Sequence, residues 1–149
     1  MTPGVTMPTA AIKAMDSERN MDKKEAPSSM WQGVVLEESL EDKSILDMTR
    51  IVGTNVSKLE KENRVMTFHK VEVPDSLRGE YIERAKTNIK QGFYTHLCKD
   101  GQMTVVFKNK VFNFGDNDPR LIKAREYGKS IGIIPEQMPF EHLINNPFD

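Results

Sequence analysis

The sequence predicts an α+β fold in which an antiparallel-rich sheet carries two main helices packed on one face. Residues 92–114 contain three short β-rich segments separated by turn residues, which is typical of a three-stranded meander. Residues 51–59 and 64–73 are rich in β-branched side chains and flank a polar connection, as in a hairpin. Two amphipathic segments, each introduced by a proline next to an aspartate, predict the helices.

The length, composition and charge of the chain limit the classes of protein to which it can belong. A chain of 149 residues with 38% hydrophobic residues is expected to form one domain with one core. Its 21 Lys and Arg are balanced by 22 Asp and Glu, so it lacks the basic excess typical of nucleic-acid binding proteins, and a nucleic-acid partner is not expected. No apolar run reaches the roughly 20 residues of a membrane helix, so no membrane partner is expected.

Composition divides the chain into three parts. Residues 1–29 contain four methionines and three prolines but no aromatic residue, and their sparse apolar content predicts a disordered N-terminal tail. Residues 30–141 carry regular hydrophobic patterning and are predicted to form the single domain, with residues 142–149 as a C-terminal tail. Because Met30 is an alternative start, whether residues 1–29 belong to the native product stays open. The single cysteine, Cys98, favours a reducing compartment, and we expect a cytoplasmic protein.

Short patterns predict the elements before the first long helix. Residues 32–40 alternate weakly between apolar and polar side chains and are predicted to form a strand. Residues 42–48 contain clustered apolar side chains and predict a short helical segment. In the hairpin that follows, Met66 and Phe68 lie opposite the β-branched face of their strand, so either both faces are covered or a bulge switches them.

The first long helix is predicted to follow Pro74. This proline ends the preceding strand, and Asp75 or Ser76 can cap the free N–H groups of a helix that starts there. Apolar residues then recur at the four-residue spacing of one buried stripe, namely Leu77, Tyr81, Ala85 and Ile89.

The meander can be assigned a register. If residues 99–101 form a three-residue loop, Phe93 faces Phe107, and phenyl rings gather on one face beneath the helices. The opposite face then carries Tyr94 and His96. A two-residue turn within this loop would shift the register by one residue and mix the two faces, so the longer loop is predicted.

Turn and cap residues mark the end of the meander and the last helix. The second turn is predicted at Asn109 and Lys110. Asp118 is the expected N-cap of the last helix, with Pro119 in its first position and Gly132 closing it.

Candidate catalytic and metal-binding residues are few. His69, His96 and Cys98 are possible zinc ligands, but a second close pair of ligands is missing, so no metal site is predicted. His96 and Cys98 lie two residues apart on one predicted strand, which is too far for a direct hydrogen bond between base and nucleophile. No glycine-rich phosphate loop is present, and we assign no cofactor and no catalytic residue.

The polar face of the meander is the predicted contact surface. Tyr94, His96 and Lys108 lie on it, and no second helix layer is expected to cover it. We therefore predict a small non-enzymatic binding or assembly module whose partner is a second copy in a homodimer or another protein. Two alternatives stay open: a small enzyme that uses His96 or Cys98, and a single-stranded nucleic-acid-binding domain that stacks bases on this face.

Three segments carry a resemblance to other proteins. Gly-Phe-Tyr-Thr-His at residues 92–96, Val-Val-Phe-Lys-Asn-Lys-Val-Phe at residues 105–112 and Tyr-Gly-Lys-Ser-Ile-Gly-Ile at residues 127–133 resemble a group of short uncharacterised prokaryotic α+β proteins. The resemblance covers about residues 31–140 and implies an α+β fold. Since the function of that group is unknown, it implies no activity and no site residue.

Overall fold

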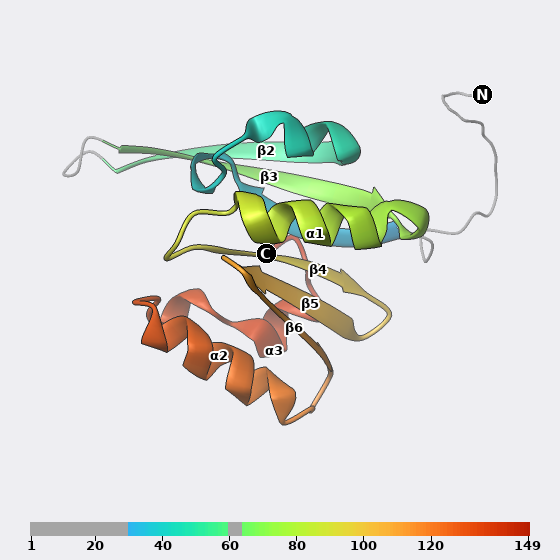
Figure 1. Ribbon diagram of the computed structural model, residues 1–149, viewed down its shortest axis with the longest axis vertical. Coiled ribbons are helices and arrows are strands. Elements are labelled where there is room, and N and C mark those ends of the chain that lie inside the picture. The colour runs from blue at the N-terminus through green and yellow to red at the C-terminus, as the bar shows by residue number, and fades with distance from the viewer. Residues whose placement is uncertain (1–29, 60–63) are drawn as a thin grey trace. The chain divides into compact units, whose positions relative to one another are not determined.

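A six-stranded antiparallel sheet organises residues 30–59 and 64–149, which are the residues that the computed structural model of the chain describes (Figure 1). The strand order is β2-β3-β1-β4-β5-β6, so β2 and β6 are the two edges. The strands are β1 (Met30–Leu36), β2 (Arg50–Leu59), β3 (Arg64–Pro74), β4 (Tyr94–Lys99), β5 (Gln102–Phe107) and β6 (Lys110–Gly115). The α-helices of the described residues are α1 (Arg78–Asn88), α2 (Arg120–Ser130) and α3 (Phe140–Leu143). The predicted tail of residues 1–29 and the connection 60–63 lie outside the described residues.

The helices α1 and α2 cover opposite faces of the sheet, and the prediction that both pack on one face is wrong. Side chains of α1 share a core cluster with Val106 of β5, whereas those of α2 share a different cluster with Val105 and Phe107. Successive residues of a strand point to opposite faces, so the two clusters lie on opposite sides of β5. In Figure 1, strands β4–β6 separate α1 from α2.

The register between β4 and β5 differs by one residue from the predicted one. Tyr94 pairs with Phe107 and His96 pairs with Val105, so both lie on the face that carries the phenyl rings. The prediction that His96 and Phe107 lie on opposite faces is therefore wrong. A one-residue shift moves every side chain of a strand to the other face, which places Leu97 beneath α1 instead.

The turn between β4 and β5 gives the physical reason for this register. Asp100 and Gly101 both have positive φ, at 50° and 77°, as a two-residue type I′ turn requires. The turn between β5 and β6 consists of Lys108 and Asn109, and Asn109 has a φ of 61°. The predicted turn, Asn109 and Lys110, is therefore wrong by one residue. With this turn, Lys110 does not need the left-handed conformation. The pairing of β5 with β6 is shifted by two residues relative to the predicted pairing, and an even shift keeps each side chain on its predicted face.

Most other predicted elements are confirmed. The 3₁₀ segment η4 (Lys43–Met48) replaces the predicted short helical turn, and β2 with β3 forms the predicted hairpin. The bulge that could switch faces lies in β2, between Ile51 and Gly53. The predicted first strand is shorter, because the 3₁₀ segment η3 (Glu37–Ser39) follows β1 directly.

The predicted N-caps are not reproduced at either long helix. The helix α2 begins at Arg120 with Pro119 at the N-cap, one residue later than predicted, although the Asp118 carboxylate accepts a hydrogen bond from the Arg120 backbone N–H at 2.9 Å. Gly132 follows the end of α2 with φ 99°, as predicted. Before α1, Asp75 lies in a 3₁₀ turn and no side chain caps the helix. Leu77 also lies in this 3₁₀ turn and is exposed, while the rest of the predicted stripe is buried.

The chain after α2 packs against the sheet. Met138 and Phe140 are fully buried in the cluster beneath α2, and Leu143 and Ile144 join them. The close approach of this segment requires Gly128, because a Cβ at that position would overlap the sulfur of Met138. The segment thereby covers the phenyl-bearing face of β4 and β5.

Candidate functional site

The edge strand β2 is the most exposed strand of the described chain. It is ten residues long and contains neither proline nor an acidic residue. Among its apolar side chains, Ile51 is 45% exposed, Val52 42% and Val56 60%. Edge strands of natural proteins are usually short, charged or covered, because their outer N–H and C=O groups are free to pair with another strand. In β2 the bulge and the basic residues lie toward the two ends, whereas residues 53–57 carry no charge. The middle of this long strand, with the exposed Val56, is therefore a candidate contact site.

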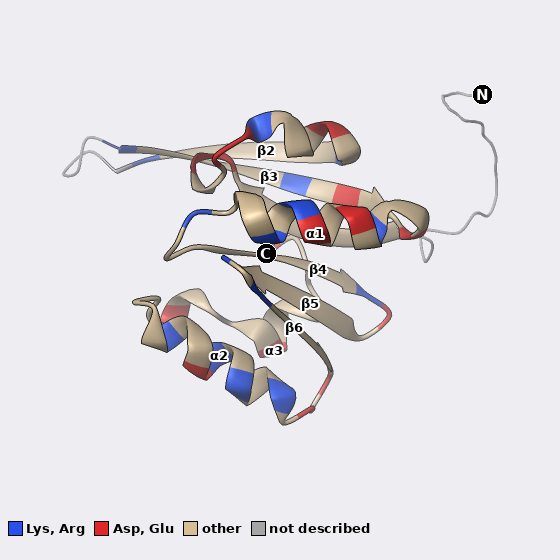
Figure 2. Ribbon diagram, viewed as in Figure 1, with Lys and Arg blue, Asp and Glu red and all other residues tan. Residues whose placement is uncertain are grey.

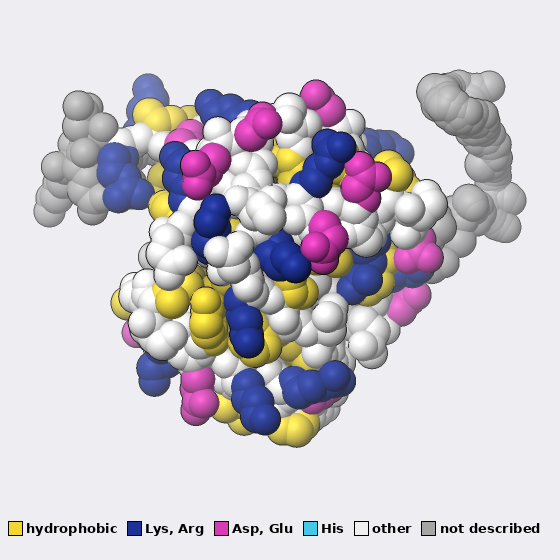
Figure 3. Space-filling model, in the orientation of Figure 1, with side chains coloured by type: hydrophobic (Ala, Val, Ile, Leu, Met, Phe, Trp, Pro, Cys, Tyr) yellow, Lys and Arg dark blue, Asp and Glu magenta, His cyan; other side chains and the backbone are white. Residues whose placement is uncertain are grey.

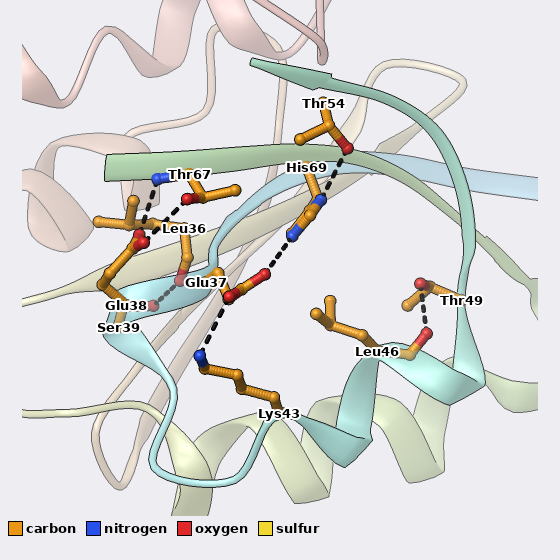
Figure 4. Close-up of polar contacts among 10 residues, drawn as sticks. All are labelled: Leu36, Glu37, Glu38, Ser39, Lys43, Leu46, Thr49, Thr54, Thr67 and His69. Carbon is orange, nitrogen blue, oxygen red and sulfur yellow. Dashed lines mark hydrogen bonds and ion pairs between the residues drawn. The ribbon is translucent and has the colours of Figure 1, made fainter. Parts of the chain in front are cut away.

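A carboxylate, an imidazole and a hydroxyl brace this strand from the face that carries α1 (Figure 4). Glu37, just after β1, accepts a hydrogen bond from Nε2 of His69 at 2.7 Å. The opposite ring nitrogen, Nδ1, lies 2.9 Å from Oγ1 of Thr54 on β2. In the neutral ring, a proton on Nε2 leaves Nδ1 as the acceptor for the Thr54 hydroxyl. The contacts thus link β1, β3 and β2 in a single chain of hydrogen bonds.

Two further contacts fix the carboxylates of this cluster (Figure 4). Lys43 Nζ lies 3.0 Å from Glu37, and the hydrogen bond from His69 together with that from Lys43 lowers the pKa of Glu37. Glu38 accepts hydrogen bonds from the backbone N–H of Thr67 at 2.7 Å and from its hydroxyl at 2.9 Å. Burial raises the pKa of Glu38, but the bonds from Thr67 outweigh it and leave the pKa below its usual value. Both carboxylates are therefore charged near neutral pH.

The Glu37–His69–Thr54 arrangement has the order of groups that activates a hydroxyl nucleophile. Acyl transfer needs donors placed where negative charge develops. The other donor side chains drawn in Figure 4 are already engaged: Lys43 is paired with Glu37, Thr67 donates to Glu38, and Ser39 and Thr49 donate to backbone carbonyls. We therefore interpret the cluster as a brace for β2.

Tyr94 does not lie on an open surface. Its ring packs at a centroid distance of 6.0 Å from Phe107 and 5.5 Å from Phe140. Its hydroxyl donates a hydrogen bond to the Gln137 carbonyl at 2.6 Å, and burial raises the pKa of the phenol. Tyr94 thus holds the segment after α2 against the sheet.

His96 and Cys98 are buried, with 4% and 3% of their surface exposed. His96 Nε2 donates to the Pro147 carbonyl at 2.8 Å, and burial lowers the pKa of the ring to about 4. Burial raises the pKa of the Cys98 thiol to about 12, which keeps it protonated and poorly nucleophilic at neutral pH. Neither residue has the environment of a catalytic base or nucleophile.

Lys108 lies in the turn between β5 and β6, next to Phe107, the partner of Tyr94, but its side chain reaches α1 and not the face of Tyr94 and His96. Its Nζ donates to the Thr87 carbonyl at 2.6 Å and lies 3.5 Å from Glu41. Tyr94 and His96 share the face beneath the C-terminal segment. The structure does not bring the three together on an exposed sheet face, so that predicted surface is wrong.

The contact between Glu37 and His69 escaped the sequence analysis. The sequence pattern gives His69 a place on its strand, but no carboxylate partner is predicted for it. The described residues contain no group of three or more His, Cys, Asp or Glu side chains that could hold a metal ion. The available signal was the alternation in β3, which places His69 on the same face as Val71 and therefore toward the core.

Comparisons with known proteins add no assignment. No family model, curated protein or solved structure matches this chain. Of the helices in the described part of the chain, none has the length and apolar content needed to cross a membrane.

Proposed function

We propose that this protein is a non-enzymatic binding module that takes an extended, acidic segment of a partner protein as an additional strand along β2. The observation that carries the proposal is the edge strand itself, with its exposed apolar side chains and its lack of acidic residues or proline. Strand addition draws affinity from main-chain hydrogen bonds and specificity from alternate side chains. As an edge strand with exposed side chains, β2 provides both main-chain groups and side chains for such pairing.

The middle of β2 is suited to pairing. Its bulge lies near one end, between Ile51 and Gly53, and pairing with β3 is regular from Gly53 to Leu59. Thr54 and Val56 point to the braced face, where their partners on β3 are His69 and Thr67. Because the hydrogen bonds through His69 hold β2 extended, less conformational entropy is lost when a partner strand binds.

Charge favours an acidic partner over a second copy of this chain. Arg50 and Lys58 lie near the two ends of β2, and Arg50 Nε lies 3.9 Å from Glu72 of β3. Figure 2 shows basic residues where the β2–β3 ribbon meets the grey connection. If two β2 strands paired antiparallel along their whole length, Arg50 of one would approach Lys58 of the other at both ends. Like charges placed across a strand pair are destabilising, whereas acidic residues at the ends of a partner segment would be attracted.

The test compares two substitutions that place the same charge on surfaces of similar exposure. Val56→Glu alters the middle of β2, and Ile122→Glu alters the exposed face of α2, where Ile122 is 54% exposed. The probe is a short fluorescent peptide in which valine and threonine alternate between terminal glutamates, and anisotropy measures its binding. We expect Val56→Glu to weaken binding by about tenfold or more, which corresponds to about 1.4 kcal/mol, and Ile122→Glu to leave it unchanged.

Three results would overturn the proposal. The first is absence of binding by the acidic peptide, and the second is equal binding by a peptide with terminal lysines. The third is a concentration-dependent dimer of the unmodified chain in sedimentation that Val56→Glu abolishes, because a second copy would then occupy β2.

A further inference from the structure

A groove between α1 and β6 is separate from the β2 edge. It has a volume of about 480 Å³, within the range of small-molecule sites. Arg78, Gly79 and Ile82 of α1 form one wall, and Val111 and Asn113 of β6 form the other. Figure 3 shows Lys and Arg side chains and apolar side chains together on the face between these two elements.

Arg78 brings a positive charge into this groove without a carboxylate bonded to it. One guanidinium nitrogen, Nη2, donates to Thr104 Oγ1 at 2.5 Å and to Asn113 Oδ1 at 3.0 Å, and both acceptors are neutral. The guanidinium carbon lies 4.2 Å from the centroid of the Trp31 ring. Its Nε is buried and has no hydrogen-bond partner among the described residues. Half-buried charges are usually paired, so this guanidinium favours an anion from outside the chain.

The neighbouring acidic groups are engaged elsewhere. Asp75 accepts a hydrogen bond from Trp31 Nε1 at 2.7 Å and lies 3.4 Å from Lys99 Nζ. Asp75 raises the pKa of Arg78, but burial opposes this more strongly and lowers it overall. Glu83, the acidic residue in the lining of the groove, is paired with Lys86 at 3.1 Å. The nearby carboxylates of the described chain are thus bonded to other groups, and none of them forms an ion pair with Arg78.

The first turn of α1 lies at the same end of the groove. The helix begins at Arg78 without a side-chain cap, and both Arg78 and Gly79 line the groove. Gly79 leaves open space, since no heavy atom lies within 4 Å of the position a Cβ would occupy. We propose that this groove binds a phosphate-bearing small molecule, with the phosphate on Arg78 and an apolar or aromatic body between Ile82 and Val111.

Adenosine monophosphate, inorganic phosphate and adenosine serve as probes, with affinities measured by calorimetry. We expect adenosine monophosphate to bind, phosphate to bind more weakly, and adenosine to bind at least about tenfold more weakly than the monophosphate. Gly79→Glu places a carboxylate at the mouth of the groove, and Arg78→Gln removes the cation. Each should reduce the affinity for the monophosphate by about tenfold or more, whereas Gly79→Ala and Arg84→Gln should retain it. Arg84 is a matched control because it lies on α1 and pairs with Glu80.

Equal binding of adenosine and its monophosphate would overturn this inference, as would absence of binding at millimolar concentration. Unchanged affinity in Gly79→Glu would also overturn it, even if Arg78→Gln failed to fold. The groove and β2 are tested independently, because Val56→Glu should leave binding of the monophosphate unaffected and Gly79→Glu should leave peptide binding unaffected.

Discussion

His96 should make the folded protein sensitive to mild acid. Because burial lowers the pKa of the folded ring from 6.5 to about 4, the unfolded chain binds a proton between these pH values and the folded chain does not. The free energy of unfolding therefore falls as the pH falls through this window. At about 1.4 kcal/mol for each pH unit, the loss between pH 7 and pH 5 amounts to about 2 kcal/mol.

Urea unfolding followed by the fluorescence of Trp31 measures this loss at pH 7 and pH 5. His96→Gln keeps a donor for the Pro147 carbonyl but cannot be protonated in this range, so its free energy of unfolding should fall by about 2 kcal/mol less than that of the unmodified chain. His142→Gln is the control, because His142 is exposed and pairs with Asp149. If His96→Gln lost as much stability on acidification as the unmodified chain, His96 would not be buried in the neutral state.

Two glycines and the single cysteine give further predictions. Gly79→Ala should raise the free energy of unfolding by about 0.5–1 kcal/mol, because this helical position is exposed and unobstructed. Gly128→Ala should lower it by about 1–3 kcal/mol, because the new methyl group would overlap the buried sulfur of Met138. Urea titration ranks the two variants, and the reverse order would contradict the packing of α2. Cys98 should react with a thiol reagent at pH 8 only after denaturant is added, because burial raises the pKa of its thiol to about 12. Immediate reaction of the folded chain would contradict its burial.

Local chemistry made most elements predictable from the sequence. The ends of α2 lie within a residue of those expected, because the contact of Asp118 with Arg120 and the left-handed Gly132 act within a few residues. The hairpin of β2 and β3 was also predictable, because two β-branched segments flank a short polar connection. Predictions failed where two distant elements decide the outcome, as with the face of β4.

The register of β4 shows why a clean separation of apolar and polar faces was a poor guide. That criterion assumes that one face of the sheet meets water. Here both faces of β4 are covered, so Leu97 is stabilised beneath α1 and His96 is tolerated beneath the C-terminal segment as a neutral, hydrogen-bonded ring. The Asp100-Gly101 turn, a strong local signal, should have outweighed the pattern of faces.

The contacts of the candidate sites could not be predicted for a related reason. Glu37 and His69 are 32 residues apart, and Arg78 and Asn113 are 35 residues apart. Glu37 meets His69 because β1 lies beside β3, and Arg78 meets Asn113 because α1 covers this face of the sheet. Neither the strand order nor the covered face can be read from the sequence alone. Polar residues that meet only through topology carry no local spacing that marks them.

The position of β1 in the middle of the sheet has a consequence for biosynthesis. β1 lies between β3 and β4, and its residue Gln32 pairs with Cys98. A nascent chain that has left the ribosome only as far as Asn88 therefore carries two unsatisfied strand edges, one on β1 and one on β2. Completion of β4 closes the first of these edges. Truncated translation products that end before Tyr94 should consequently be the species that aggregate and require chaperones.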